Sequence, residues 1–313
     1  MDTFGNIFRL TDWGDTHGEA LEGLIEGCPA GLRVDMDFVT AELNRRAPSC
    51  DALSTKRQET DRVEFLSGIE DGVTTGDPIR FRIPNVDVKV SAVNRYVLKP
   101  SHASYTYMRK YGVNDNEMCG RASARQTVCR AVAGAIAKLW LKSRGVQITS
   151  KVLNIAEAKR EGDSVGALVE CRITGLPAGL GEPVYDKFSA RLAYAMLSIN
   201  AAKGFDYGLG FKAAEMSGSE YHDVQNPDFS FKTNHDGGIQ GGITNGEEVY
   251  FRVAFKPIPS VRYDRETVDF GGNPVVMRGS DRNDLCVAPR VLPVVEAMAA
   301  MVAMDFWLMQ HYY

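Results

Sequence analysis

Two histidines in polar stretches are the side chains of this sequence best suited to moving protons. His17 lies in residues 14–18, between glycines, and His102 lies in the turn-prone residues 99–104. Imidazole titrates near neutral pH, so either ring could give or take a proton under ordinary conditions. Glycine and small polar neighbours place a histidine on a loop more often than in a core. Taken alone, each histidine is more simply explained as a structural or surface residue. Whether either one is catalytic therefore depends on the residues around it.

Arginines near the start of a predicted helix suggest a second kind of chemistry, the binding of an anion. Residues 124–142 show helical spacing of apolar side chains, and Arg121 and Arg125 are four positions apart at its beginning. Side chains at that spacing share one helix face. Cations at a helix N-terminus are unfavourable by a few tenths to about 1 kcal/mol, so an anion between the two would explain them. Solvated surface charges are the alternative.

The composition is that of a globular protein with a slight excess of acidic residues. The chain has 313 residues, of which 44% are hydrophobic, and a formal net charge of −4, which argues against nucleic acid or an anionic membrane as its main partner. Six cysteines are scattered singly, without the spacing of metal ligands, so we expect no metal site. The N-terminus does not resemble a signal sequence, so we expect a reduced, cytoplasmic location.

Periodicity and turn signals predict the elements that must hold these side chains. Apolar residues at helical spacing in 291–309, interrupted by Glu296 and Asp305, predict a buried helix and not a membrane span. The other predicted helices are 35–46, 124–142 and one that Ser189 caps and that ends near Gly204 in a left-handed conformation. The predicted strands are 21–26, 147–153, 165–173, 249–255 and a hairpin pair in 63–83 that turns at 72–76. A long loop is expected at 217–246. Aromatic residues at alternate spacing are more often packing residues, so we assign no role to Tyr105, Tyr107 and Tyr111.

The chain also contains an internal similarity. Residues 76–83 (GDPIRFRI) resemble residues 246–253 (GEEVYFRV), at an offset of 170 from Gly76 to Gly246. Each copy follows a glycine-rich turn and precedes a long apolar helix at some distance. This pattern predicts a duplicated unit, about 1–145 and 146–313, with two sheets and helices buried between them. The alternative is that both copies are ordinary hairpin strands of similar composition.

Four segments together resemble the chorismate synthase family. They are GDTHG (14–18), PSHASYTY (100–107), GRASARQT (120–127) and MLSINAAKG (196–204), and residues 162–167, 176–183, 234–242 and 282–286 extend the resemblance. The similarity runs from residue 4 to about residue 304, with one family segment shortened after Leu153. It implies a single domain over 1–313 of the α+β class. The implied fold is an internally duplicated β-α-β sandwich, with helices packed between two antiparallel four-stranded sheets.

The resemblance also implies an activity. Members of this family convert 5-enolpyruvylshikimate 3-phosphate to chorismate by a 1,4-anti elimination of phosphate and a ring proton, and they need reduced FMN although no net redox change occurs. By the resemblance, His17 protonates the departing phosphate and His102 faces the flavin ring near its N1. Asp284 is implied to act with flavin N5 in removing the ring proton. A helix N-terminal cap is the structural explanation for Asp284, and both roles could hold together.

Binding residues are implied in the same way. The implied substrate-binding residues are Arg45, Arg46, Lys99, Ser123 and Arg125, and Arg46 is also implied to contact NADPH. The implied flavin-binding residues are Arg121, Ala122, Ser123, Asn200, Ala201, Gly241, Lys256, Pro257, Ile258, Pro259, Ser260 and Arg282. A substrate with a phosphate and two carboxylates requires such cations. Arg45 and Arg46 also close a predicted helix, where cations are favourable by themselves. The family implies a homotetramer and a small-molecule substrate.

Some positions depart from the family pattern. Lys99 replaces an arginine, Ala52 stands where members often carry a basic side chain, Ala122 replaces a serine and Asn283 replaces a histidine. Lysine keeps the charge of arginine but not its bidentate geometry. The leading hypothesis is a flavin-dependent lyase. The alternatives are a catalytically inactive homologue acting as an oligomeric anion- or flavin-binding protein, and a phosphate-handling enzyme without flavin.

Overall fold

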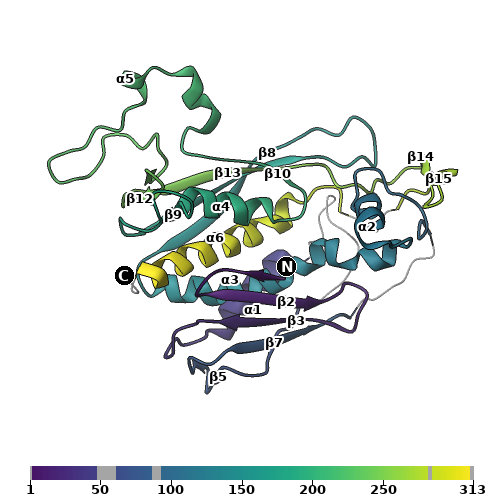
Figure 1. Ribbon diagram of the computed structural model, residues 1–313, viewed down its shortest axis with the longest axis horizontal. Coiled ribbons are helices and arrows are strands. Elements are labelled where there is room, and N and C mark those ends of the chain that lie inside the picture. Colours follow the sequence, from purple (N-terminus) through teal and green to yellow (C-terminus); the bar gives the residue numbers. More distant parts are fainter. Residues whose placement is uncertain (1, 48–60, 87–92, 281–283, 311–313) are drawn as a thin grey trace.

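Two antiparallel sheets with helices between them form the body of the protein (Figure 1). The computed structural model describes residues 2–47, 61–86, 93–280 and 284–310. The strand order of the first sheet is β1 (Thr3–Phe4), β2 (Arg9–Gly14), β3 (Ala20–Glu26), β7 (Ile79–Pro84) and β4 (Glu64–Phe65). The strand order of the second sheet is β10 (Ala202–Tyr207), β13 (Val249–Phe255), β9 (Ala167–Thr174) and β8 (Gln147–Ile155). The α+β sandwich is confirmed, but the first sheet has five strands and not four, because short strands pair at both of its edges.

Helices fill the space between the two sheets. They are α1 (Met36–Arg46), α3 (Thr127–Lys142), α4 (Phe188–Leu197) and α6 (Ala288–Gln310). Helix α6 is long and apolar enough to cross a membrane, yet 83% of its most apolar window is buried inside the protein, as expected of a core helix. Helices α3 and α6 cross at Gly134, where an added Cβ would lie 2.1 Å from Cβ of Ala297. Close packing of the two backbones therefore requires glycine at this position.

Alternating burial orients both sheets toward the helices. In β13, Val249, Phe251, Val253 and Phe255 are buried and the residues between them are half-buried. The same alternation marks β3, where Gly23 makes room for the ring of Phe81 on β7, since an added Cβ would lie 2.3 Å from that ring. Sheets with this pattern cover the core with one face only.

The internal similarity extends to small hairpins next to the sheets. Hairpin β5–β6 (Ile69–Glu70 and Val73–Thr74) and hairpin β11–β12 (Ile239–Gln240 and Ile243–Thr244) occupy equivalent sequence positions. The hydroxyl of Thr74 donates to the carbonyl oxygen of Pro29, and the hydroxyl of Thr244 donates to that of Pro177, each at 2.7 Å. The repeated bonds favour duplication over chance similarity of two hairpins. The division near residue 145 stays a prediction.

Several sequence predictions need correction at element ends. Helix α4 begins at Phe188 after Lys187, so Ser189 lies inside its first turn and does not cap it. The left-handed residue after this helix is Ala201, with φ of 68°, whereas Gly204 belongs to β10. The predicted helix over 124–142 begins with the 3₁₀ turn η2 (Ala124–Gln126) before α3. The capping residues that the local sequence suggested for α4 are therefore not the ones observed, because the residues after this helix pair in the second sheet as β10.

Further elements lie at the surface of the sandwich. Strands β4 and β7 do pair, but hairpin β5–β6 lies between them in the chain. Helix α2 (Ser104–Tyr111), which the sequence patterns did not predict, leaves Tyr105 and Tyr111 more than half exposed, so these two do not pack in the core. The remaining elements are the 3₁₀ helices η1 (Asn116–Ala122) and η3 (Gly210–Glu215), α5 (Gly218–Tyr221), β14 (Arg265–Val268) and β15 (Pro274–Met277). Thus the expected long loop at 217–246 holds a short helix and a hairpin.

Candidate active site

His17 lies on the exposed loop between β2 and β3, and this loop packs against η1. The backbone N–H of His17 donates to Oδ1 of Asp15 at 2.7 Å, and the amide of Asn85 donates to the carbonyl oxygens of Asp15 and Gly18 at 3.0 and 2.8 Å. An added Cβ on Gly120 of η1 would lie 2.3 Å from the Asp15 carboxylate. Glycine at this position therefore lets the His17 loop approach the GRASAR segment.

His102 lies just before α2 and is linked through Ser104 to the start of η1. Its Nδ1 is 2.7 Å from the hydroxyl oxygen of Ser104, which donates to Oδ1 of Asn116 at the start of η1 at 2.6 Å. Burial, followed by the charges of Lys99 and Lys256, lowers the pKa of His102 to about 4. His102 is therefore neutral at pH 7, and both histidines lie beside the same short helix.

Lys256 connects the segment around His102 to two other predicted segments, those of residues 200–201 and of Ala122. Its backbone N–H donates to the carbonyl oxygen of Ala201 at 2.9 Å, and its Nζ donates to that of Ser101 at 2.5 Å. The amide of Asn200 donates to the carbonyl oxygen of Ala122 at 2.8 Å. The structure thus brings together His102, Lys256, Asn200, Ala201 and Ala122.

The segment after Lys256 is fixed at its carbonyl groups. The hydroxyl of Ser164 donates to the carbonyl oxygen of Ile258 at 2.7 Å, and the guanidinium of Arg265 donates to that of Pro259. Together with two prolines, these bonds give the segment 256–260 little freedom. It continues directly from β13, as predicted.

Two lysines leave positive charge uncompensated at this place. Burial lowers the pKa of Lys99, and burial followed by the charge of Lys203 lowers the pKa of Lys256. Within the described ranges, neither lysine forms an ion pair with a carboxylate. Ala201, which bonds to the backbone of Lys256, and the bonded pair Asn200 and Ala122 offer small side chains and backbone groups beside Lys256. This combination fits a flat, anionic group such as a flavin phosphate or a reduced flavin ring.

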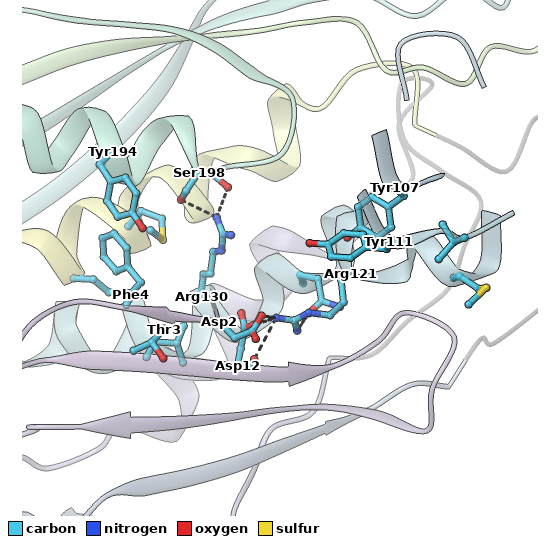
Figure 2. A pocket seen from close by; sticks show the side chains of 16 residues that line it. Asp2, Thr3, Phe4, Asp12, Tyr107, Tyr111, Arg121, Arg130, Tyr194 and Ser198 are labelled. Carbon is cyan, nitrogen blue, oxygen red and sulfur yellow. Dashed lines mark hydrogen bonds and ion pairs between the residues drawn. The ribbon is translucent and has the colours of Figure 1, made fainter. Parts of the chain in front are cut away.

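Arg121 points away from Arg125, which corrects the expectation of a shared helix face. Ser123 is extended between η1 and η2, so the two arginines belong to separate turns. The guanidinium of Arg121 bonds to Asp2 and Asp12, each at 2.7 Å. It lines a cavity of about 610 Å³ that Arg130, Tyr107 and Tyr194 also line (Figure 2). His17, His102 and Asp284 do not line this cavity.

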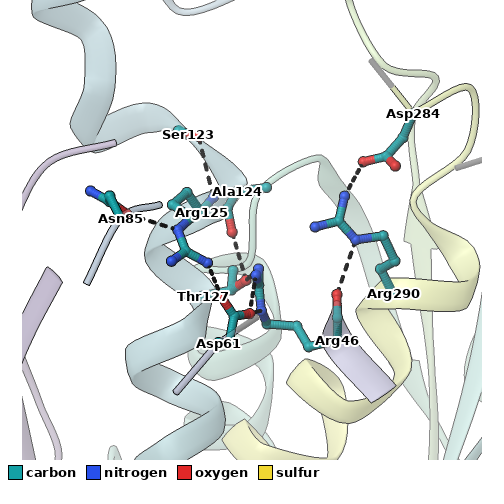
Figure 3. A network of polar contacts seen from close by, with 9 residues as sticks. All are labelled: Arg46, Asp61, Asn85, Ser123, Ala124, Arg125, Thr127, Asp284 and Arg290. Carbon is teal, nitrogen blue, oxygen red and sulfur yellow. Dashed lines mark hydrogen bonds and ion pairs between the residues drawn. The ribbon is translucent and has the colours of Figure 1, made fainter. Parts of the chain in front are cut away.

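A buried carboxylate holds two of the predicted arginines (Figure 3). The side chain of Asp61 has no exposed surface, lies 2.7 Å from Nη2 of Arg46 and also bonds to Nη1 of Arg125. Burial alone would raise the pKa of Asp61, but the two guanidiniums outweigh it and hold that pKa below its usual range. Nε of Arg125 donates to Oδ1 of Asn85 at 3.1 Å, which joins this group to the His17 loop.

Arg290 connects Asp284 to the same group. Its Nη1 donates to Oδ2 of Asp284 at 2.6 Å, and its Nε donates to the carbonyl oxygen of Arg46 at 3.0 Å (Figure 3). Asp284 precedes the first residue of α6 by four positions, so it is too far away to be the N-cap of that helix. The contacts therefore run without interruption from the His17 loop to Asp284. We call the charged members of this network, Arg46, Asp61, Arg125, Asp284 and Arg290, the arginine cluster.

Sequence patterns did not point to Asn85, Asp61 or Arg290. Asp61 and Asn85 lie in stretches with no motif, and their partners are distant in the chain. Arg290 carried one weak signal, since it lies six positions after Asp284 in the first turn of α6.

Some predicted binding residues lie elsewhere. Arg45 bonds to Glu42 and Glu296 in a separate buried network with Lys138, on the side of α1 that faces α6. Gly241 lies in hairpin β11–β12, which precedes β13, whereas Lys256 directly follows β13. The seven residues of β13 put its two ends about 20 Å apart, so Gly241 and Lys256 lie near opposite ends of this strand. Figure 1 shows β12 and α2 at opposite ends of the molecule. Arg282 lies outside the described residues, as do Ala52 and Asn283.

The fold and the site define an α+β protein whose cationic groups and two histidines suit acid–base chemistry on a small anion. The family model described as chorismate synthase matches residues 8–159 and 153–308. These segments meet at 153–159, where the sequence predicts a shortened family segment. The chain belongs to the chorismate synthase family.

Individual relatives agree with this membership. A chorismate synthase of Phocaeicola vulgatus is 46% identical, with 98% of each chain covered, and one of Christiangramia forsetii is 46% identical, covering 98% of this chain and 97% of its own. A crystal structure of chorismate synthase superposes with a TM-score of 0.77 at 28% identity, covering 98% of this chain and 93% of that chain. Similarity over nearly the whole length accounts for both halves of the fold.

Proposed function

We propose that this chain converts 5-enolpyruvylshikimate 3-phosphate to chorismate by 1,4-anti elimination of phosphate and a ring proton. The observation that carries the proposal is the unbroken series of contacts between the His17 loop, the arginine cluster and Asp284, of which Figure 3 shows the part from Asn85 to Asp284. This series supports the proposal because the residues proposed as proton donor, anion-binding groups and carboxylate lie along it. Such groups are what removal of a proton and departure of phosphate require.

The charged groups of the site support an anionic substrate. Within the described ranges Lys99 and Lys256 form no ion pair with a carboxylate, and Arg46, Arg125 and Arg290 contribute three guanidiniums to the site. Bound anions offset the cost of burying positive charge. A ring bearing one phosphate and two carboxylates would supply such anions, with Arg125, Ser123 and Lys99 as contacts. Arg46 is held by Asp61, so it acts mainly by its charge.

The roles of the ionisable groups follow from their surroundings. His17 is exposed on a loop held by Asn85 and can protonate a departing phosphate. His102 is neutral, because burial and Lys99 lower its pKa, and it can therefore accept a proton. Arg290 donates to Asp284 and fixes the position of its carboxyl group, which can help to remove the ring proton. Reduced FMN, when bound, supplies electron density that promotes loss of the phosphate.

The residues beside His102 form the proposed flavin contact. Ala122, Ser123, Asn200, Ala201 and the segment 256–260 offer small side chains and backbone groups to the ring, and Lys256 offers a cation. Arg282 is included in this proposal by the resemblance. Gly241 lies too far along β13 to join these residues within one chain. Its proposed flavin contact therefore involves another copy in a homotetramer.

The proposal includes two further parts. NADPH is the proposed reductant of the flavin, with Arg46 among its contacts, and the proposed location is the cytoplasm. The relatives are named as the enzyme itself, which gives no support to an inactive homologue.

The test is an anaerobic assay of chorismate formation, run once with chemically reduced FMN and once with NADPH plus oxidised FMN. Chorismate in the first assay supports the elimination, and chorismate in both supports NADPH as the reductant. Tight binding of the substrate without turnover in the first assay would overturn the proposal in favour of a binding protein.

A further inference from the structure

The ring of His102 is held by hydrogen bonds that lead away from it into the protein. Nδ1 of His102 lies 2.7 Å from Oγ of Ser104, and Oγ of Ser104 lies 2.6 Å from Oδ1 of Asn116. The amide nitrogen of Asn116 donates to the carbonyl oxygens of Asn94 and Val97 at 2.8 and 2.7 Å. Ser104 is fully buried, so its hydroxyl must find its partners within this group.

The positions of the hydrogens in the series His102–Ser104–Asn116 can be deduced by starting from Asn116. Asn116 directs both amide hydrogens at carbonyl oxygens, which only accept, so its Oδ1 faces Ser104. Because Oδ1 also only accepts, the single hydroxyl hydrogen of Ser104 must lie between these two oxygens. The oxygen of Ser104 is then left with lone pairs toward His102. A contact of 2.7 Å between it and Nδ1 requires a hydrogen on Nδ1.

One longer contact competes with this arrangement. The backbone N–H of Ser104 lies 3.2 Å from Nδ1 and would favour a lone pair there. With a lone pair on Nδ1, however, two lone pairs would face each other across 2.7 Å at the hydroxyl oxygen. The closer contact therefore decides the tautomer.

We propose that Ser104 and Asn116 are positioning residues that hold neutral His102 with its hydrogen on Nδ1, so that Nε2 carries the lone pair. The inference deepens the proposed function, on which its catalytic consequence rests. A proton that Nε2 accepts gives an imidazolium whose Nδ1–H still bonds to Ser104. Nε2–H can then give that proton back to the group that released it, and no other hydrogen in the series has to move.

The tautomer is measured directly by NMR on the full-length protein labelled with ¹⁵N-histidine. Long-range ¹H–¹⁵N spectra at pH 7 distinguish a protonated from an unprotonated ring nitrogen for each of the five histidines, and His102→Gln assigns the signal. The expected result is a protonated Nδ1 and an unprotonated Nε2. An unprotonated Nδ1 overturns the inference, whether or not the protein makes chorismate.

Variants then separate positioning from folding. Ser104→Ala is expected to lose the single tautomer and to lower kcat about tenfold, at the lower end of what loss of a histidine-orienting partner costs, with FMN affinity unchanged. Ser104→Thr keeps a hydroxyl and is expected to restore the wild-type tautomer. Thr106→Ala is the matched control, because that hydroxyl only donates to the carbonyl oxygen of Ala103 on the same helix.

The outcomes are separable. A wild-type tautomer and unchanged kcat in Ser104→Ala would overturn the positioning role. If this variant does not fold, the wild-type spectrum alone decides whether Nδ1 carries the hydrogen. A protonated Nδ1 in a protein that forms no chorismate would contradict the proposed function but not the tautomer.

Discussion

Replacing Glu296 by Gln should destabilise the protein, and by an amount that depends on pH. Glu296 projects from α6 into the space between α1, α3 and β8, where its side chain is 3% exposed. It bonds to Arg45 at 2.7 and 2.8 Å, to Ser150 at 2.7 Å and to Lys138. Burial would raise the pKa of Glu296, but these partners lower it to about 2.

The magnitude follows from this pKa. A fall from 4.5 to about 2 corresponds to about 3 kcal/mol of stabilisation at pH 7. Removing one partner of a buried ion pair by mutation typically costs about 3–5 kcal/mol, which agrees. Because the folded-state pKa is depressed, the stabilisation is complete above pH 4.5 and is lost as pH falls toward 2. At pH 3 about 1.4 kcal/mol should remain.

Urea denaturation of wild type and Glu296→Gln at pH 7 and at pH 3 measures both values. The matched control is Glu26→Gln, which removes a carboxylate paired with Arg9 at 2.6 Å on a partly exposed strand and should change stability by about 0–1 kcal/mol. A destabilisation below 1 kcal/mol at pH 7, or one that is equal at both pH values, would refute the reasoning.

Three other predictions concern the site and the helix crossing. His102→Gln should lose most chorismate formation but retain FMN binding in a fluorescence titration; unchanged turnover would remove His102 from the mechanism. Arg290→Met should lower kcat/KM about a hundredfold by releasing Asp284, with the Tm close to that of Arg278→Met, an exposed pair. An equal kcat/KM in both variants would contradict this. Gly134→Ala should cost about 1–3 kcal/mol against Ala297, measured as a lower Tm, whereas an unchanged Tm would contradict the close crossing.

The adjacent residues Arg45 and Arg46 bind different partners, which the sequence did not predict. Arg45 and Arg46 close the same helix and look alike in the sequence, and the resemblance assigns both to the substrate. Consecutive helical residues point about 100° apart, and each takes the partner that packing provides. Arg45 meets Glu296 from α6, whereas Arg46 meets Asp61. The choice depends on which elements flank α1, and local sequence does not contain that information.

The GRASAR segment gives a second example. Helical spacing predicted one face for Arg121 and Arg125, but Ser123 is extended and separates two 3₁₀ turns. The segment must approach Asp15 on one side and Asn200 on the other, and these distant contacts override local helix propensity. The sequence could identify this segment but not the directions in which the side chains of Arg121 and Arg125 point.

The sequence by itself determined the α+β class, the strands and core helices, the internal similarity and the family, because these depend on periodicity and ordered motifs. Only the tertiary structure decided that Asp61, Asn85 and Arg290 join the His17 loop to Asp284, and that Ser104 and Asn116 hold His102. Hydrogen bonds and ion pairs form between atoms a few ångströms apart. Which atoms those are is fixed by how the sheets and helices pack, not by separation along the chain.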